Sequence, residues 1–327
     1  MYGSIIKRVI SVVVAFLLLV VVTKVVVWSK QFMDATGLTP TTLFRLAFDT
    51  GVPLNSSDGR TNILILGIGG GVHAGADLTD TMMVFSVDAN QKSIAMISLP
   101  RDIWSDTLKD KVNSAYHYGK APLAKVITSE VVDLPIHYVL LIDFSGFEDV
   151  IDLVGGVTVA VPNAFTDPDF PIAGREEDFC NGDPEYRCRY ETVSFEQGLQ
   201  NMSGERALTY VRSRHAEGEE GSDFARSRRQ QDVMVALKEK IMRPEVYLSP
   251  TKVRELLRAF DNATETDLRI GELATIAKIV SSIPGDHIRR ISLEDKLDIA
   301  PLWLYGRYAL VPKESWEAIR QYIRSQL

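Results

Sequence analysis

The chain has 327 residues, of which 46% are hydrophobic, and its formal net charge is −7. This apolar content is enough for a well-packed core, and the length allows one large domain or two ordinary ones. The acidic balance argues against general binding of nucleic acid, which requires a basic domain, so we expect no nucleic-acid partner.

The first long apolar segment covers residues 9–28 and has Lys24 as its single charge. Twenty helical residues measure ~30 Å, which matches the hydrocarbon core of a bilayer. Lys7 and Arg8 precede the segment, and no small-residue cleavage site closes it. The segment is therefore predicted to be an uncleaved transmembrane helix that leaves residues 1–8 in the cytoplasm. We then expect a single-pass protein of the cell membrane with an extracytoplasmic domain; a buried core helix is the alternative.

Residues 29–60 are predicted to form a juxtamembrane linker, with a short helix near 41–48 and a turn-rich end. Strands and helices then alternate. The expected strands are 62–66, 81–87, 93–99, 136–144, 157–162 and, at a sheet edge, 287–293; the expected helices are 145–156, 200–211, 250–260, 270–283 and 313–326. This alternation predicts a three-layer α/β/α domain with a central, mostly mixed sheet over residues 61–243. Residues 244–327 are expected to form a mainly helical extension packed on the same domain.

Both cysteines, Cys180 and Cys188, lie in residues 163–192, a segment predicted to be irregular. Outside the cytoplasm two cysteines eight positions apart are expected to form a disulfide. A zinc site would need two more ligands at suitable spacing, and none is nearby.

The stretch RSRHAEGEEGSDFARSRRQQ, residues 212–231, carries five arginines. If Arg212 and Arg214 are extended, a period of two places both guanidinium groups on one face. Ser222 or Asp223 is then the expected N-cap of a helix. One face of that helix carries, at helical spacing, Arg226, Gln230, Val233, Leu237 and Ile241.

The C-terminal half of this helix face is apolar and should point into the protein, so Arg226 and Gln230 should point inward as well. Inward arginine at the positive end of a helix predicts an anion site, most naturally for phosphate. A solvated basic face is the alternative. Arg228 should point to solvent, because helical geometry turns it about 160–200° away from Arg226.

Other candidate ligands follow predicted strands. A glycine-rich loop, residues 67–71, follows the first strand, and Asp77 and Asp80 come shortly after it. Arg101 follows the strand at 93–99, at the carboxyl end where ligands of α/β sheets gather. Arginines and aspartates together suit a diphosphate with a divalent cation and hence phosphoryl-type transfer. Among the histidines, His137 is expected to be structural, and His215 is a candidate ligand contact.

Six ordered motifs resemble the LytR-CpsA-Psr family of membrane-anchored cell-wall glycopolymer transferases. They are NILILG at 62–67, DLTDTMMV at 77–84, SLPRD at 98–102, KVNSAY at 111–116, GGVTVAVP at 155–162, and YVRSRH with SDFARSRRQQ at 210–231. The resemblance implies an extracytoplasmic α/β/α domain with a pocket for a polyprenyl chain. It also implies transfer of a glycan 1-phosphate from polyprenyl pyrophosphate to a peptidoglycan hydroxyl, with Mg²⁺ or Mn²⁺ as cofactor.

By position in these motifs, the resemblance implies a role for each matching residue. The pyrophosphate-binding residues are Arg101, Lys111, Arg212, Arg214, Arg226 and Gln230. Asp80 is implied as a metal ligand, and Asp223 as an acidic residue that can act as a base. We expect the catalytic residues to be Asp223, Arg101 and Arg226.

Two departures from the family pattern leave alternatives open. The family usually has Gly-x-Asp after the first strand, and here Gly69 occupies the aspartate position. Asp77 is expected to replace that metal ligand, or the metal is bound more weakly. The acidic loop 216–222 is also long for the family. A hydrolase that uses water as acceptor, and a non-catalytic lipid-binding or regulatory envelope protein, are the alternative functions.

Overall fold

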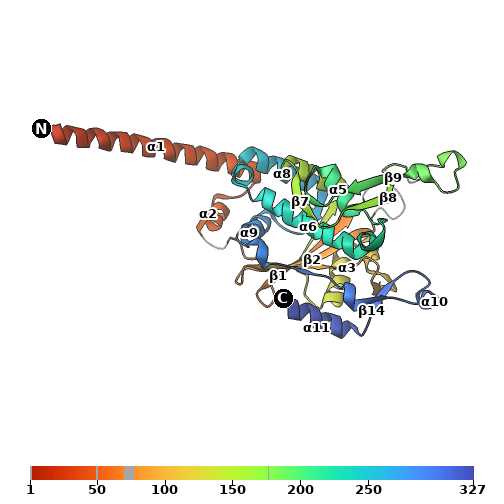
Figure 1. The fold of residues 1–327 in the computed structure, drawn as a ribbon. Helices are drawn as coiled ribbons and strands as arrows, with labels where there is room; N and C mark the ends of the chain where they lie inside the picture. The colour runs from red at the N-terminus through yellow and green to blue at the C-terminus, as the bar shows by residue number, and fades with distance from the viewer. Residues whose placement is uncertain (1, 49–50, 70–76, 176) are drawn as a thin grey trace.

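The computed structural model describes residues 2–48, 51–69, 77–175 and 177–327, and Figure 1 shows their arrangement. The chain begins with the long helix α1 (Tyr2–Thr36). In the part of the chain that is described, no helix has a stretch long and apolar enough to cross a bilayer. The membrane anchor over residues 9–28 remains a prediction. Helix α2 (Pro40–Phe48) confirms the short helix expected in the linker.

A six-stranded sheet lies at the centre of the molecule, in the order β11-β6-β1-β2-β3-β12. Its strands are β1 (Arg60–Ile68), β2 (Thr79–Asp88), β3 (Ser93–Ser98), β6 (Tyr138–Asp143), β11 (Thr264–Thr266) and β12 (Ile288–Ile291). The pairs β1–β6 and β3–β12 are parallel, and the other pairs are antiparallel. The sheet is therefore mixed, as predicted, and β12 confirms the expected edge strand.

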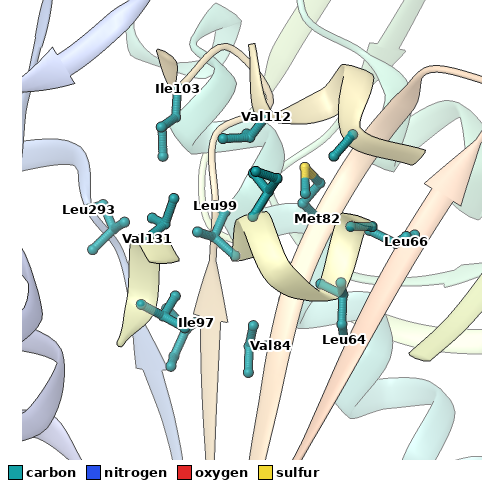
Figure 2. Packing of buried hydrophobic residues seen from close by; sticks show 14 of the residues in the cluster. Leu64, Leu66, Met82, Val84, Ile97, Leu99, Ile103, Val112, Val131 and Leu293 are labelled. Atoms are coloured by element: carbon teal, nitrogen blue, oxygen red, sulfur yellow. The ribbon is translucent and has the colours of Figure 1, made fainter. Parts of the chain in front are cut away.

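Both faces of the sheet are covered, because its central strands are apolar on both sides. On β2, Met82 and Val84 pack with helices α3 (Ala115–Val132) and α11 (Trp316–Gln326), as Figure 2 shows for part of this core. The next residue, Met83, faces the opposite way, against partly buried side chains of α6 (Asp223–Ile241) and α9 (Ile270–Ser281). Alternation of side chains along a strand explains this two-sided core. The three-layer arrangement follows.

Shorter elements surround this sheet. The helices are α4 (Phe144–Leu153), α5 (Gly204–Arg212), α7 (Pro244–Tyr247), α8 (Pro250–Ala263) and α10 (Leu302–Tyr305). The two-stranded sheets are β4 (Trp104–Ser105) with β5 (Asp110–Lys111), β7 (Val157–Val161) with β10 (Gly198–Met202), β8 (Phe165–Pro171) with β9 (Tyr190–Phe195), and β13 (Leu297–Ile299) with β14 (Leu310–Pro312). Single 3-10 turns are η1 (Val112–Ser114), η2 (Cys180–Gly182), η3 (Arg187–Arg189), η4 (Gly218–Gly221), η5 (Gly285–His287) and η6 (Glu294–Lys296).

Two predictions of secondary structure are wrong. Residues 163–192 are not irregular throughout, because β8 and the start of β9 form a hairpin there, with residues 172–189 between its strands. Residues 200–202 belong to β10 rather than to a helix, since the hydroxyl of Ser203 accepts a bond from the N–H of Arg206 and caps α5 only from that point. The predicted helical extension, 244–327, does contain helices, but it also supplies both edge strands of the central sheet, β11 and β12.

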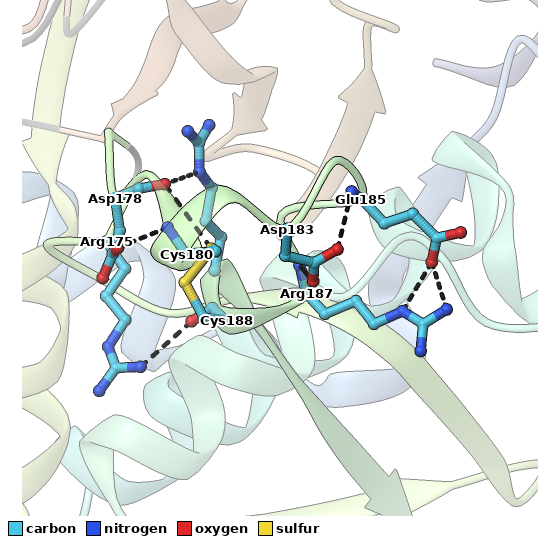
Figure 3. The surroundings of a disulfide bond; sticks show 8 residues. Arg175, Asp178, Cys180, Asp183, Glu185, Arg187 and Cys188 are labelled. Atoms are coloured by element: carbon cyan, nitrogen blue, oxygen red, sulfur yellow. Dashed lines mark hydrogen bonds and ion pairs between the residues drawn. A yellow bond between two sulfur atoms is a disulfide. The ribbon is translucent and has the colours of Figure 1, made fainter.

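The β8–β9 hairpin projects from the body and ends in a disulfide-closed tip (Figures 1 and 3). Cys180 and Cys188 form the disulfide, with their Cα atoms 5.5 Å apart. This confirms the predicted pair. Around the disulfide, Arg175 donates to the carbonyl of Cys188 at 3.2 Å, so the tip has its own polar contacts.

Candidate active site

Helix α6 begins where the sequence predicts. Ser222 is the N-cap, and its Oγ accepts a bond from the N–H of Ala225 at 3.1 Å. Asp223 is the first helical residue. Of the two predicted caps, the serine is therefore the one used, which leaves the Asp223 carboxylate available for contacts in the site.

The predicted inward face of α6 is confirmed. Arg226, Val233 and Leu237 on this face are buried. The side-chain amide of Gln230 donates to the hydroxyl of Thr81 on β2 at 2.8 Å. Arg228 lies on the outer face, 49% exposed and 3.3 Å from Glu294, which confirms its predicted direction.

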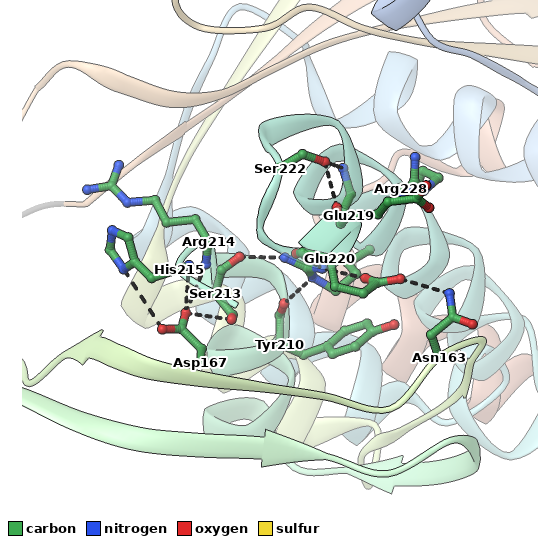
Figure 4. A network of polar contacts seen from close by, with 12 residues as sticks. Asn163, Asp167, Tyr210, Ser213, Arg214, His215, Glu219, Glu220, Ser222 and Arg228 are labelled. Atoms are coloured by element: carbon green, nitrogen blue, oxygen red, sulfur yellow. Dashed lines mark hydrogen bonds and ion pairs between the residues drawn. The ribbon is translucent and has the colours of Figure 1, made fainter. Parts of the chain in front are cut away.

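The predicted extended pairing of Arg212 and Arg214 is wrong. Arg212 is the last residue of α5, because the helix continues to this point and ends at Ser213. Its guanidinium group lies over the rings of Phe144, at 4.8 Å, and Phe170, at 5.7 Å. Arg214 lies beyond the helix end, and Figure 4 shows its side chain extending away from the polar network beneath it. The two arginines thus approach the site from a helix end and a loop.

A buried carboxylate shapes this loop. Asp167 on β8 is fully buried, and its Oδ2 accepts bonds from the Ser213 hydroxyl at 2.6 Å, the Arg214 N–H at 2.9 Å and the His215 N–H at 3.2 Å (Figure 4). Burial alone would raise the pKa of Asp167, but these hydrogen bonds outweigh it and lower the pKa. The ring of His215 is hydrogen-bonded to the carbonyl of Asp169 at 3.0 Å, so it faces the hairpin in this structure.

Arg229 is a second buried element of the same network. Its guanidinium group donates to the carbonyls of Tyr210 and Ser213 and to both the carbonyl and the carboxylate of Glu220. The side chain is only 2% exposed. These bonds tie α6 to the end of α5 and to the acidic loop, so Arg229 holds the segment that carries Arg214.

Asp80 and Arg101 meet at the carboxyl end of β3. Asp80 lies at a register shift between β1 and β2, where Gly67 pairs with Thr81 but Ile68 pairs with Thr79. Such a bulge re-aims a side chain and is common next to active sites. Asp80 forms an ion pair with the guanidinium group of Arg101.

Asp102 extends this pair to Lys111. Its carboxylate, 8% exposed, forms an ion pair with the ammonium group of Lys111 and lies 3.5 Å from Nε of Arg101. Lys111 reaches this position because β4 and β5 form a short hairpin directly after Asp102. Arg101 and Lys111, predicted from separate motifs, are therefore brought together by one carboxylate.

Two guanidinium groups in this region have a donor without a partner. Nε of Arg101 and Nε of Arg226 are buried and make no hydrogen bond; the 3.5 Å contact of Arg101 with Asp102 is an ion pair without one. The Arg226 guanidinium group forms an ion pair with the Asp223 carboxylate at 3.0 Å and donates a hydrogen bond to the Asp80 carbonyl at 3.4 Å. A buried polar atom without a partner is costly, and an anion in the site would supply partners for both.

The pKa shifts place these groups in one electrostatic cluster. Burial, followed by Arg101 and Arg214 as like charges, lowers the pKa of Arg226 against the opposing effect of Asp223. Burial also acts to lower the pKa of Arg101, but Asp80, Asp102 and Asp223 outweigh it and raise the pKa. Arg101, Arg214, Arg226 and Asp223 therefore act on one another electrostatically, and we call this group the arginine cluster. Neighbouring guanidinium groups repel, and a bound polyanion would relieve this repulsion.

The two carboxylates predicted to hold a metal bind different cations of the protein. Asp80 faces Arg101, whereas Asp77 contacts His117 at 2.7 Å and Lys120 at 3.1 Å. The hydrogen bonds from His117 and Lys120 lower the pKa of Asp77. Oxygen donors of this kind are those that Mg²⁺ prefers. Asp80 fits as a single carboxylate ligand at the arginine cluster, and Asp77 lies in a separate ion-pair group. Gly69 is the last described residue of β1's glycine-rich loop, and residues 70–71 lie outside the described residues.

An apolar cavity of about 60 Å³ lies beside Gln230, one turn of α6 after Arg226. Its wall is formed by the β1–β2 side of the sheet and by α4, α5 and α6, with Ile65, Met83, Phe144, Phe147, Leu208 and Met234 among the lining residues. Gln230 and Thr81 also line it, and Phe144 lies beneath Arg212. A hydrophobic space therefore adjoins a cationic one, an arrangement that suits an amphiphilic anion.

Some residues of the site were not predicted from the sequence. Arg229 could have been predicted from the sequence, because it lies three residues after Arg226 and helical spacing makes the two side chains neighbours on α6. Asp102 directly follows Arg101, but nothing in the sequence links it to Lys111. Asp167 could not be predicted from the sequence, because its position depends on contacts with residues far away in the sequence.

Comparison with known proteins identifies the family of the chain. A model of the LytR_cpsA_psr family matches residues 38–322. The polyisoprenyl-teichoic acid–peptidoglycan teichoic acid transferase TagV of Bacillus subtilis is 29% identical over 221 residues, which are 66% of this chain and 51% of TagV. Regulatory protein MsrR of Staphylococcus aureus is 31% identical over 216 residues, 64% of this chain and 58% of MsrR.

The fold is also found in solved structures. The crystal structure of B. subtilis TagV superposes with a TM-score of 0.61 at 24% identity, covering 83% of this chain and 98% of that one. At this identity the similarity concerns the fold. The chain spans between 51% and 58% of the length of the two curated relatives above. The match of the family model over most of the chain shows that this protein belongs to the LytR_cpsA_psr family.

Proposed function

We propose that this protein transfers a glycan 1-phosphate from polyprenyl pyrophosphate to a hydroxyl of peptidoglycan. The observation that carries the proposal is the pair of buried Nε donors of Arg101 and Arg226, which have no hydrogen-bond partner. Guanidinium groups bind phosphate through charge-assisted, often bidentate bonds. The name of TagV, a polyisoprenyl-teichoic acid–peptidoglycan transferase, supports the same class of reaction.

In this proposal the diphosphate lies between Arg101 and Arg226. Arg212 and Arg214 contribute positive charge from the end of α5 and the following loop, Lys111 from the β4–β5 hairpin, and Gln230 a donor beside the cavity. We propose that these groups keep their positions when the substrate binds, so that little reorganisation is needed as charge develops in the transition state. The apolar cavity beside Phe144 would receive the first part of the polyprenyl chain.

The cavity must widen for this purpose. Its volume of about 60 Å³ is far below the roughly 300–1,000 Å³ of a typical ligand pocket. Its walls belong to α4, α5 and α6 on one side and to the sheet on the other. We expect the helices to separate from the sheet when the lipid enters, and a structure with lipid bound would display this movement.

We propose Asp223 as the general base. In the proposed step its carboxylate accepts the proton of the acceptor hydroxyl, and the hydroxyl oxygen bonds to the phosphorus that carries the glycan. The bond from this phosphorus to the bridging oxygen breaks, and polyprenyl phosphate leaves with the electron pair. Arg101 and Arg226 stabilise the charge on the phosphoryl oxygens during this exchange.

Mg²⁺, or Mn²⁺ in its place, is proposed as the cofactor, with Asp80 as the carboxylate ligand. Asp77 is proposed as a second or outer ligand, although in this structure it pairs with His117 and Lys120 instead. When bound, such an ion would neutralise charge on the diphosphate. Asp80→Ala should abolish metal-dependent turnover, and Asp77→Ala should weaken the apparent affinity for the metal. The measurement is turnover against metal concentration after chelation. An unchanged metal dependence in Asp77→Ala would remove Asp77 from the ligand set.

We also propose that the apolar segment 9–28 anchors the protein in the cell membrane, with the rest of the chain outside the cytoplasm. The Cys180–Cys188 disulfide supports an oxidising compartment. Protease added to intact spheroplasts should digest the chain beyond residue 30, and full protection would refute this location.

The test of the function is a transfer assay with labelled polyprenyl-pyrophosphate glycan and purified peptidoglycan. Covalent label on peptidoglycan, lost in Asp223→Asn, is the expected result. Release of glycan phosphate to water without labelled peptidoglycan would instead indicate a hydrolase. Binding of the lipid without either product would indicate a non-catalytic lipid-binding protein, a class that the name of regulatory protein MsrR keeps open.

A further inference from the structure

The loop between β13 and β14 exposes large apolar side chains next to the candidate site. Leu302 is 65% exposed, Trp303 84% and Leu304 58%. They form the short helix α10, which projects from the body in Figure 1. Contiguous exposed apolar side chains commonly mark an interaction site. In the described part of the chain, these three side chains remain exposed to solvent.

The inner end of this loop borders the arginine cluster. The N–H of Leu310 donates to the carbonyl of Asp102 at 2.8 Å, which fixes the loop to the residue that joins Arg101 and Lys111. Nζ of Lys111 lies 5.7 Å from the centre of the Tyr308 ring. Burial, followed by the charges of Asp223 and Asp102, raises the pKa of Tyr308. Tyr308 therefore lies at the edge of the candidate site.

The outer part of the loop is held in place by aromatic and polar contacts. The rings of Trp104 and Tyr305 meet edge to face at 4.8 Å. Asp110 accepts bonds from Arg307 and from the Tyr118 hydroxyl, both at 2.9 Å. The surface thus combines aromatic rings with a fixed carboxylate, guanidinium group and phenol. We call Trp104, Trp303, Tyr305 and Tyr308 the aromatic rim.

We propose that the aromatic rim binds the glycan strand of the acceptor. The C–H faces of sugar rings pack on aromatic rings, while their hydroxyls bond to carboxylate, guanidinium and phenol groups, so this combination suits a polysaccharide. The rim is continuous with the site through Tyr308, which would lead one hydroxyl towards Asp223. This inference rests on the proposed transfer reaction and extends it to a surface for the second substrate.

Other occupants fit the rim less well. In Figure 1, α10 lies at the opposite end of the molecule from the N-terminal end of α1, so a bilayer around α1 would not reach it. A protein partner would use the exposed Leu302 and Leu304 but would leave the Arg307–Asp110 pair beside the site unexplained. A glycan strand uses the rings and the polar pair together.

The experiment measures binding of soluble peptidoglycan glycan strands to the full-length chain in lipid nanodiscs, by isothermal titration. Trp303→Ala and Tyr308→Ala should each weaken binding at least tenfold, and Tyr308→Phe should retain it, because the ring remains. Phe179→Ala is the matched control: Phe179 is 81% exposed on the disulfide tip, away from the rim, and its loss should change binding less than twofold. Thermal unfolding of each variant verifies the fold.

Unchanged glycan affinity in both Trp303→Ala and Tyr308→Ala would overturn the proposal. So would Trp303-dependent fluorescence quenching by brominated lipid in the nanodisc, because that result would assign the rim to the membrane surface. Binding to glycan strands needs no turnover, so its failure is distinguishable from failure of the transfer reaction, which the labelled-lipid assay reports separately.

Discussion

Two buried arginines on one helix, three residues apart, have opposite surroundings. Arg229 is 2% exposed, and each of its guanidinium nitrogens bonds a carbonyl or carboxylate of Tyr210, Ser213 or Glu220. Arg226 is 7% exposed but leaves Nε without a hydrogen-bond partner. The first arginine joins α6 to α5 and the acidic loop, and the second faces Arg101 and Asp80.

The difference teaches that burial of an arginine does not by itself mark a ligand site. A fully bonded guanidinium group is part of the fold, because nothing remains for a ligand to complete. One with a free buried donor costs roughly 1–3 kcal/mol until a partner arrives. Such a cost is tolerated where function needs it. Hydrogen bonding therefore distinguishes Arg229, which holds the fold, from Arg226, which has a donor available to a ligand. The sequence pattern alone does not distinguish them.

Removing Arg229 should have the largest effect on stability. Arg229→Ala breaks a buried ion pair and leaves Glu220, 13% exposed, together with two carbonyls without their partner. The expected loss is about 3–5 kcal/mol in the free energy of unfolding. Urea denaturation of the purified protein measures it. A loss below about 1 kcal/mol would mean that Arg229 is not the structural member of the pair.

The carboxylate of the same network predicts a pH dependence. The folded pKa of Asp167 is lowered, so its ionised form contributes stability that is complete above the ordinary value of about 3.9 and is lost as pH falls through the folded pKa. Asp167→Asn should cost about 1–3 kcal/mol at neutral pH. Below about pH 4 its stability should decline less steeply than that of the wild type. Equal slopes of the urea midpoint against pH would contradict this role.

Arg226→Ala should cost far less stability than Arg229→Ala. Removing Arg226 eliminates a buried donor without a partner and the repulsion from Arg101, which offsets the lost ion pair with Asp223. We expect a change within about 1 kcal/mol, measured in the same urea experiment. A loss as large as that of Arg229→Ala would erase the distinction between the two arginines.

Local hydrophobic patterns in the sequence predicted the helices and strands that have a buried face. The apolar stripe that continues from Arg226 to Leu237 predicted the direction of α6, and the two N-cap candidates, Ser222 and Asp223, marked the helix start. Short apolar runs gave the buried strands of the sheet. These features depend on neighbours within one or two turns, so the sequence alone carries them.

Features set by distant contacts could not be predicted. The β8 strand contains Pro168 and Pro171 and has an irregular register after Asp167, so it does not have the pattern of a regular strand. The direction of Arg214 depends on Asp167, 47 positions earlier in the chain. Tyr308 lies in a loop that the bond from Leu310 to Asp102 holds beside the site. No periodicity connects such residues.

The most direct test of the account compares Arg226→Ala with Arg228→Ala in single-turnover transfer from a labelled polyprenyl-pyrophosphate glycan. Arg226 faces the proposed diphosphate, whereas Arg228 is 49% exposed on the other side of α6 and forms a surface ion pair with Glu294. Arg226→Ala should lose about 2–4 kcal/mol of transition-state stabilisation, a slowing of roughly 30- to 1000-fold, and Arg226→Lys should recover part of it. Arg228→Ala should remain within about twofold of the wild type. If Arg228→Ala is as slow as Arg226→Ala, the assignment of the inner face of α6 to the diphosphate is contradicted.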